Sequence, residues 1–466
     1  MAAKIIGRLV QFGYAKEATR GTYVAATYWL PFMDLTLDEK QEKVFDEQAY
    51  GIIEDAVSAS NTGVHIEGSV TANLYDQSFG LFLFSMMGTL TTHAAHSGET
   101  GVYDNVFNIA ETSQHQSLSF SIHDPGAAVD YAYLNGVIEK LEINIELKKF
   151  VQFVATFKAM TGVVKSTFTP ATTTENRFLP QYLTLSIANK LAGIETVFAA
   201  TGTAATTTAV SALSIPTDRL KVGMVVVGTN IPAGTTVAAI VSATAFTLSQ
   251  ASTGNASDLT FSSLAGTGTA STTVNVTALS GTPAITTAQL QVGMTVTGPN
   301  IPAGATIAAI VSSTAFTLSI ATTGVASTMS FGPMVVKVKS AKLSINQNVE
   351  AQDVLGSTSP ADFLNKEFNV TFSIEAIWQN ESDFKTDFMS NAANAFRLDM
   401  KNTDVTIGIA ANPQLQIDMA QCYVTELSRP IKVKDLIYQT IKGRAVYSIS
   451  DTSMLKATLV NTVNGF

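Results

Sequence analysis

The sequence predicts a mainly β fold with one or two flanking α-helices, interrupted by two small all-β domains. First, apolar and polar residues alternate with a period of two over several segments, as half-buried strands require. Second, this alternation changes twice to a helical period directly after a strand. Third, the middle of the chain is an internal repeat of short Val- and Thr-rich segments separated by Gly and Pro-Ala-Gly turns.

The composition limits the classes of function. The chain has 466 residues, enough for several domains, and 14% of them are charged, well below the usual quarter. The net charge of −9, without a basic run, argues against unaided affinity for nucleic acid. We find no signal peptide and no apolar run of about 18 residues, so we expect assembly in the cytoplasm and no membrane insertion.

The chain begins with a lead-in and one strand, Tyr28 to Phe32, followed by a charged segment with few core positions, Asp34 to Gly63. One interpretation of this segment is a solvated surface loop. The other is an extended arm that reaches a neighbouring subunit, since loops of this length usually have a function. The candidate contact residues of such an inter-ring or inter-subunit arm are Asp38, Glu39, Lys40, Glu42, Lys43, Asp46 and Glu47.

Val64 to Leu74 then alternates as a strand, and Asp76 can cap a helix that carries Phe79 to Met87. We expect a polar turn region over Thr91 to Gly101. It contains His93 and His96, and this pair without a third ligand is more typical of exposed loop histidines than of a metal site. Strands resume, ending in a hairpin from Leu141 through Phe157.

The same order of elements returns near the C-terminus. Phe368 to Trp378 alternates as a strand, after which Ser382 or Asp383 can cap a helix. The helical period places Phe384, Phe388, Ala392, Ala395 and Phe396 on one face and predicts a helix that stops near Asn402. A second hairpin, from Leu415 to Ile449, follows. We therefore expect two versions of one strand–helix–hairpin unit.

Between these halves lies the repeat, in which residues 194–332 include only five charged side chains: Glu195, Asp218, Arg219, Lys221 and Asp258. Leu220 to Gly234 returns as Leu290 to Gly304, about 70 residues later, and roughly two-thirds of the aligned positions are identical. Each copy predicts a small immunoglobulin-like β-sandwich, over residues 193–262 and 263–333. The expected core residues are Val226, Ile240, Val241, Phe246 and Leu248, with their partners Val296, Ile310, Val311, Phe316 and Leu318.

The repeat interrupts a discontinuous domain of residues 1–192 and 334–466. The flanking stretches Tyr182 to Lys190 and Val335 to Ile345 have strand patterns, so we expect them to be neighbours in one sheet, with the repeats projecting outward. The candidate insertion hinges are Gly193, Gly332 and Pro333.

The sequence contains no recognisable catalytic constellation. The GxSxG, HExxH, GxxxxGK[ST] and DxDxDG patterns are missing, and the five histidines have no partnered nucleophile. The single cysteine, Cys422, excludes an intrachain disulfide, and its place in a strand pattern favours a buried structural thiol. We therefore predict no catalytic, cofactor-binding or metal residues, no cofactor and no enzymatic activity.

Several short motifs carry a resemblance to a known family. Lys342 to Glu350, then Val354 to Asp362, then the strand to Trp378, resemble the second half of the major tail tube proteins of long-tailed, non-contractile (siphovirus-type) bacteriophages. Tyr14 to Tyr23 resembles the opening of that family, and Tyr133 to Ile143 its later hairpin. The resemblance covers most of residues 1–192 and 334–466.

The resemblance implies a virion structural protein with a tail-tube-like β-sandwich or barrel. Its subunits join their sheets into rings, trimeric if the chain holds two units and otherwise hexameric, and the rings stack into a hollow tube for DNA ejection. The acidic balance fits a lumen through which DNA passes without specific binding. The implied partners are the protein itself and the tape measure, terminator and distal tail proteins.

The repeats resemble small decoration domains outside such tubes, where weak contact with host-surface glycans is the expected ligand chemistry. Two other interpretations stay open. A different virion β-protein, such as a tail terminator or capsid decoration, would not polymerise axially. A surface adhesin with glycan-binding repeats would explain the repeats but neither the strand–helix ends nor the missing export signal.

Overall fold

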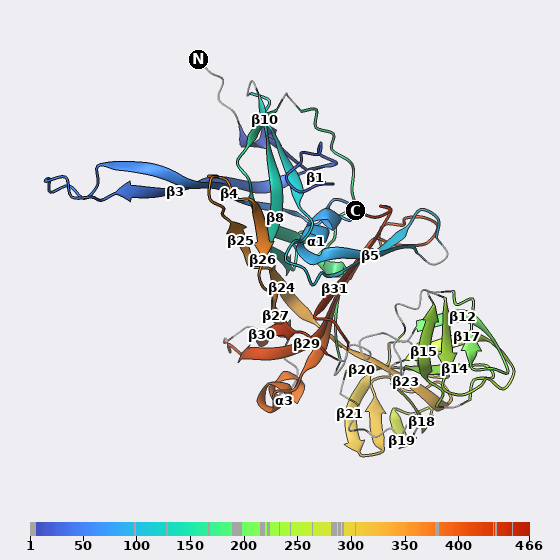
Figure 1. Ribbon diagram of the computed structural model, residues 1–466. Coiled ribbons are helices and arrows are strands. Elements are labelled where there is room, and N and C mark those ends of the chain that lie inside the picture. Colours follow the sequence, from blue (N-terminus) through green and yellow to red (C-terminus); the bar gives the residue numbers. More distant parts are fainter. Residues whose placement is uncertain are drawn as a thin grey trace.

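The computed structural model is mainly β, with 57% of residues in strands and 5% in helices, as the sequence predicts (Figure 1). The structure describes residues 6–96, 99–126, 129–165, 168–188, 198–214, 220, 224–232, 234–242, 244–262, 264–280, 287, 290, 293–302, 304–377, 382–431, 433, 436–449 and 451–466.

The centre of the molecule is an antiparallel sheet in the order β3-β4-β9-β8-β24-β27-β30-β29, in which consecutive strands are hydrogen-bonded. Buried apolar side chains from these strands form the main hydrophobic core. The bounds are β3 (Phe32–Asp46), β4 (Ser58–Asn73), β9 (Gln152–Ala159), β8 (Asp130–Glu146), β24 (Val338–Asn346), β27 (Asn369–Ile377), β30 (Tyr438–Val446) and β29 (Gln414–Ser428).

This sheet consists of two four-stranded units with the same order and register, β3-β4-β9-β8 and β24-β27-β30-β29. The register of β3 on β4 shifts between Phe32 and Asp34, and that of β24 on β27 shifts between Val338 and Ser340. The hairpins β8–β9 and β29–β30 also have a register shift at the same place, after Ile138 in the first and after Val424 in the second. Helix α1 (Phe79–Met87) follows β4, and helix α3 (Ser382–Ser390) follows β27. The two halves thus share one topology.

A cross-strand pair of one glycine and one phenylalanine occurs at the same place in both units. Gly68 lies opposite Phe157 in the first unit, and Phe372 lies opposite Gly443 at the equivalent place in the second. A Cβ atom on Gly68 would lie 2.5 Å from the Phe157 ring, and one on Gly443 would lie 2.3 Å from the Phe372 ring. A phenyl ring therefore fills the space over a glycine in both units, from opposite strands.

Helix α3 is shorter than predicted. It ends at Ser390, and Asn391 adopts a left-handed conformation with φ of 54°, which terminates a helix. Ala395 and Phe396, predicted on the helix, instead lie on strand β28 (Asn394–Lys401). Phe396, Leu398 and Met400 alternate with Arg397, Asp399 and Lys401 on β28, but Ala395 and Phe396 also continue the helical spacing of Phe384 and Phe388. Five consecutive residues of β28 are buried, and the buried Arg397 pairs with Asp418 at 2.6 Å. Trp378, the predicted end of the preceding strand, lies outside the described residues.

Two further sheets extend the central one. Strands β23-β11-β28-β29-β31-β6-β5 form the first, and β2-β1-β7-β8-β10 form the second. Strand β5 corrects the expected polar turn at Thr91 to Gly101, because its ladder with β6 continues to Ala95. The bounds are β11 (Leu183–Ala188), β31 (Leu455–Asn461), β6 (Tyr103–Ile109), β5 (Gly88–Ala95), β2 (Tyr28–Leu30), β1 (Gln11–Lys16), β7 (Leu118–His123) and β10 (Val163–Lys165), with 3-10 helices η1 (Gly7–Leu9) and η2 (Pro180–Tyr182).

The charged segment Asp34 to Gly63 is an extended hairpin and not a surface loop. Its two strands, β3 and β4, pair from Phe32↔Ala72 to Asp46↔Ser58. The far part of the hairpin projects away from the rest of the molecule (Figure 1). Residues 41–64 of this hairpin are called the arm below.

Each sequence repeat contains two small groups of three hydrogen-bonded strands (Figure 1), which are separate sheets in the first repeat and are joined by a pairing of β18 with β19 in the second. The first repeat has the orders β12-β17-β14 and β13-β16-β15, and the second has β18-β23-β20 and β19-β22-β21. The bounds are β12 (Phe198–Ala205), β17 (Asn255–Ser262), β14 (Val225–Gly228), β13 (Ala209–Val210), β16 (Ala245–Leu248), β15 (Val237–Ser242), β18 (Leu264–Ser271), β23 (Val325–Val336), β20 (Met294–Thr297), β19 (Asn275–Ser280), β22 (Ala315–Leu318) and β21 (Ile307–Ser312).

The two groups of strands in each repeat share a hydrophobic cluster. The ring centroids of Phe246 and Phe261 are 5.4 Å apart in the first repeat, and those of Phe316 and Phe331 are 5.7 Å apart in the second. Four predicted core residues are exposed instead: Ile240, Val241, Ile310 and Val311. They lie on β15 and β21, which each pair with one strand only and whose first residue alone is buried.

Strand β23 runs from the second repeat directly into the main body. Leu185 and Ser186 on β11 pair with Val336 and Val335 on β23, which confirms at these residues that the stretches flanking the repeats are neighbours in one sheet. From Val338 onward the second stretch belongs to β24, which pairs with β8 and β27 instead of β11. Gly332 and Pro333, predicted as hinges, lie inside this strand and not in a loop, and a Cβ on Gly332 would be 2.3 Å from Thr295 Oγ1. Gly193, the third predicted hinge, lies outside the described residues.

Candidate functional site

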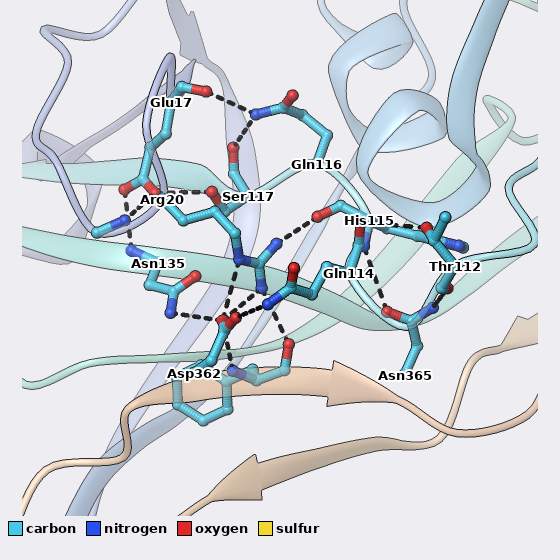
Figure 2. A network of polar contacts seen from close by, with 12 residues as sticks. Glu17, Arg20, Thr112, Gln114, His115, Gln116, Ser117, Asn135, Asp362 and Asn365 are labelled. Carbon is cyan, nitrogen blue, oxygen red and sulfur yellow. Dashed lines mark hydrogen bonds and ion pairs between the residues drawn. The ribbon is translucent and has the colours of Figure 1, made fainter.

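A network of polar side chains connects the two halves of the chain (Figure 2). It joins the segment after β1, the loop before β7 and a small hairpin formed by β25 (Val349–Gln352) and β26 (Asp362–Asn365). Two of these segments, Tyr14 to Tyr23 and Val354 to Asp362, carry the family resemblance in the sequence. The structure brings them together.

Asp362 is the centre of this network (Figure 2). Its carboxylate accepts hydrogen bonds from Arg20 Nη2 at 2.6 Å, from Gln114 Nε2 at 2.5 Å and from Asn135 Nδ2 at 3.0 Å. Burial by itself raises the pKa of Asp362, but the hydrogen bonds from Arg20 and Asn135 outweigh it, so the pKa is lowered. The ionised carboxylate is therefore the stable form in the folded chain.

Glu17 holds the turn that presents Arg20. Its buried carboxylate accepts hydrogen bonds from Ser117 Oγ at 2.7 Å and Ser119 Oγ at 2.9 Å. It also accepts the backbone N–H groups of Gly21, at 2.8 Å, and Asn135, at 2.9 Å. Four donors from three segments thus converge on one side chain and fix the position of the guanidinium.

His115 and Asn365 complete the network on the other side. The imidazole is buried, with Nδ1 2.9 Å from the carbonyl oxygen of Met86 and Nε2 3.0 Å from that of Ala110. Asn365 Nδ2 donates to the carbonyl oxygen of Thr112 at 2.8 Å. The charged groups drawn in Figure 2 bind one another and the backbone, so the arrangement can lock two halves of a subunit together.

The arm is the second candidate site, and it carries or adjoins all the predicted contact residues. Strand β3 holds Asp38, Glu39, Lys40, Glu42, Lys43 and Asp46, and Glu47 follows its last residue. The exposed apolar side chains of the arm were not predicted: Val44 and Phe45 lie among the charged residues, and Tyr50, Ile52, Ile53 and Val57 follow them. The doublets Val44-Phe45 and Ile52-Ile53 in a charged segment were the available signal. Exposed apolar groups of this kind are typical of protein–protein contacts.

Two further histidines have carboxylate partners, and the cysteine is buried. His96 Nδ1 lies 2.6 Å from Asp104 Oδ1, and His123 Nδ1 lies 2.9 Å from Asp130 Oδ2. Among the described residues, no group of three His, Cys, Asp or Glu side chains could hold a metal ion. Cys422 is buried, and burial raises the pKa of its thiol far above the ordinary value, which disfavours the reactive thiolate.

Comparisons with known proteins add no identification. A scan against models of protein families gave no match, and a search of curated proteins found no significant relative. Within the described part of the chain, no helix combines the length and the apolar composition needed to cross a membrane.

Proposed function

We propose that this chain is the subunit of a hollow tail tube of a long-tailed, non-contractile bacteriophage, in which rings of subunits stack around a conduit for DNA. The observation that carries the proposal is the central sheet with two open edges. In the described residues, no strand pairs with the outer edge of β3 or with the outer edge of β29 after Cys422. Such edges invite pairing with another chain, and joining copies edge to edge into a closed barrel satisfies them.

The polar face of the central sheet suits the wall of a DNA conduit. Lysines and glutamates alternate on it and pair with one another, as in Lys140–Glu142 at 2.6 Å, Lys342–Glu142 at 2.8 Å and Lys442–Glu426 at 2.9 Å. The other face is covered by the hydrophobic core. A lumen lined by mutually paired charges does not bind phosphates strongly, since counterion release requires unpaired basic groups. DNA would therefore pass without specific binding.

The repeats suit an outer decoration. They stand to one side of the central sheet and join it through β11 and β23 (Figure 1). Their strands are rich in Thr, Ser and Ala and nearly free of charge, so many hydroxyl groups are available for hydrogen bonds. Weak contact with host-surface glycans fits this chemistry. The tape measure, terminator and distal tail proteins are the further partners of a tube subunit.

Negative-stain electron microscopy of the purified protein at high concentration tests this function, beside a variant lacking residues 194–332. The deletion removes the segment between two paired strands, because Ile187 on β11 pairs with Met334 on β23. We expect long hollow tubes from both proteins, with a smaller outer diameter for the variant. Closed single rings that never stack would contradict the tube assignment and favour a tail terminator.

A further inference from the structure

The two units within one chain are joined by a specific strand pair. Strand β24, the first of the second unit, pairs with β8, the last of the first unit, from Ser340↔Glu146 to Asn346↔Lys140. At this internal junction Leu343 lies opposite Ile143, and Ala341 lies opposite Ile145. All four side chains are buried. The junction is therefore a strand ladder with an apolar face against the core.

Each strand at this junction has a counterpart at an open edge of the sheet. β3 is the counterpart of β24, because Leu37 lies opposite Gly68 as Leu343 lies opposite Phe372. β29 is the counterpart of β8, and the shared register shift makes Glu426 equivalent to Lys140 and Leu427 equivalent to Leu141. The central sheet thus carries the two strands of a second junction of the same kind, β3 at one open edge and β29 at the other.

The apolar side chains of this second junction are uncovered. Ile145 is 3% exposed at the internal junction, whereas Ile431, its counterpart beyond β29, is 67% exposed. On the other edge, Leu343 is buried and its counterpart Leu37 is only partly buried. Covering both edges by one pairing would remove this apolar surface from water.

We propose that the outer edge of β3 pairs antiparallel with the outer edge of β29 in a second copy of this chain, in the register that joins β24 to β8. This inference rests on the proposed ring-forming function and names the partner surfaces. Transferring the register places Lys40 opposite Glu426, Glu39 opposite Leu427 and Asp38 opposite Ser428. Lys40 and Glu426 have opposite charges, which stabilises a cross-strand pair. Pro430 has no N–H to donate and interrupts the ladder, and beyond it the same register places Ile431 opposite Leu35.

The arm then meets the second copy as the β25–β26 hairpin meets the first unit. The pair Ala351↔Phe363 in β25–β26 has the register of Phe45↔Ala59 in the arm, so the two hairpins are counterparts. In β25–β26 the phenyl ring is on the second strand: Phe363, opposite Ala351, is fully buried in one cluster with Val137 of β8. In the arm the ring is on the first strand: Phe45, the counterpart of Ala351, lies opposite Ala59 and is 55% exposed. The counterpart of Val137 is Tyr423 on β29. We assign the arm to the surface around Tyr423 of the second copy, where Phe45 becomes buried.

Disulfide trapping in the full chain tests the pairing. The variant Asp38→Cys/Ser428→Cys places thiols at directly opposed positions of the proposed ladder, within the range of Cα separations that a disulfide spans. Positions 38 and 428 are exposed in the single chain, so both thiols are accessible to the oxidant. The native Cys422 is buried, so we expect it to form no disulfide with the introduced cysteines. Under mild oxidation we expect covalent head-to-tail oligomers on a non-reducing gel.

Two matched variants serve as controls. Ser344→Cys/Glu142→Cys is the equivalent pair at the internal junction, so it should form a disulfide within one chain. Asp38→Cys/Leu427→Cys is slipped by one residue, which turns the two side chains to opposite faces, and it should give little product.

The outcomes separate this inference from the proposed function. Tubes that form without a disulfide between positions 38 and 428, while the internal control oxidises, would overturn the edge pairing and leave the tube assignment standing. Covalent oligomers that close into rings but never stack would support the edge pairing and contradict the tube. If neither oligomers nor tubes form while the internal control oxidises, the edge pairing is overturned as well.

Discussion

At the scale of single residues, the contact between Arg20 and Asp362 ties the two halves of the subunit together. Replacing Asp362 with Ala leaves the guanidinium and the amides of Gln114 and Asn135 without their acceptor. Breaking a buried pair in this way costs about 3 kcal/mol of unfolding free energy. Urea unfolding followed by tryptophan fluorescence, to which the buried Trp29 contributes, measures it. Asp38→Ala on the exposed arm strand is the control, with a change within about 0.5 kcal/mol.

The pKa of Asp362 predicts how this contact responds to acid. Its folded-state pKa is lowered, so its stabilisation is fully present above the unfolded value of about 4 and is lost as the pH falls through the folded value. Wild-type stability should therefore decline more steeply below about pH 4 than that of an Asp362→Asn variant. Unfolding curves measured between about pH 2 and pH 7 compare the two proteins. Parallel profiles would show that the carboxylate is not preferentially ionised in the folded state.

The sequence indicated the two segments of this network but not their contact. Arg20 and Asp362 are 342 positions apart, and each lies in a segment without periodicity. Their meeting depends on the ladder between β8 and β24, which places the second unit beside the first. The spacing of residues along the sequence does not predict such a junction, because the junction is set by tertiary pairing between distant strands.

At the scale of elements, the Gly–Phe pairs predict a coupled packing effect. A methyl group at Gly443 would press on the Phe372 ring and lie 2.6 Å from the backbone oxygen of Tyr423. We expect Gly443→Ala to cost about 1–3 kcal/mol of unfolding free energy, which is typical of overpacking. Gly7→Ala is the matched control, because no atom lies within 4 Å of its Cβ.

The double variant Gly443→Ala/Phe372→Leu tests the mechanism. Because the smaller leucine side chain leaves room for the methyl group, the double variant should lose less stability than the sum of the two single variants. The coupling energy from a double-mutant cycle of thermal or urea unfolding measures this difference. Strict additivity would indicate that the cost of Gly443→Ala comes from the backbone and not from the ring.

The arm predicts a separation between stability and assembly. Val44→Ser/Phe45→Ser removes two exposed apolar side chains from an element that contacts little of its own subunit. We expect an unchanged melting temperature for the monomer, within about 1 °C, because exposed substitutions rarely change stability. Assembly followed by light scattering should require a higher protein concentration. A conservative Val44→Ile/Phe45→Leu variant should assemble at nearly the wild-type concentration.

Prediction of the elements from sequence succeeded where one face of a strand is buried. Alternation identified β4, β8, β9 and β27 because their polar residues face away from the core. It failed for β28, because Ala395 and Phe396 at the start of this alternating strand also continue the helical spacing of the preceding segment. It left the arm ambiguous, because both faces of a solvated hairpin tolerate charge. Alternation therefore identifies a strand only where one face is buried and no second period overlaps it.

At the scale of the whole molecule, repetition in the sequence predicted the two inserted β repeats but not their attachment. The copies of Leu220 to Phe261 are similar enough to be recognised directly. The strand that connects them to the body is shared, since β23 pairs with β18 and β20 in the repeat and with β11 in the body. The boundary therefore falls inside a strand, where composition alone predicts a linker.

The internal duplication predicts two different symmetries in one assembled ring. If each chain contributes two equivalent four-stranded units, a ring of three chains has six such units around its lumen. The repeats and the arm occur once per chain, so the periphery of the same ring has three-fold symmetry. Electron cryo-microscopy of tubes should show near-six-fold density in the wall and three-fold projections outside, and native mass spectrometry of released rings should give three chains. In tubes of the variant lacking residues 194–332, the three outer projections should disappear while the wall keeps its six units. Six outer projections per ring would instead mean six chains, and the two units of one chain would then not be equivalent in the wall.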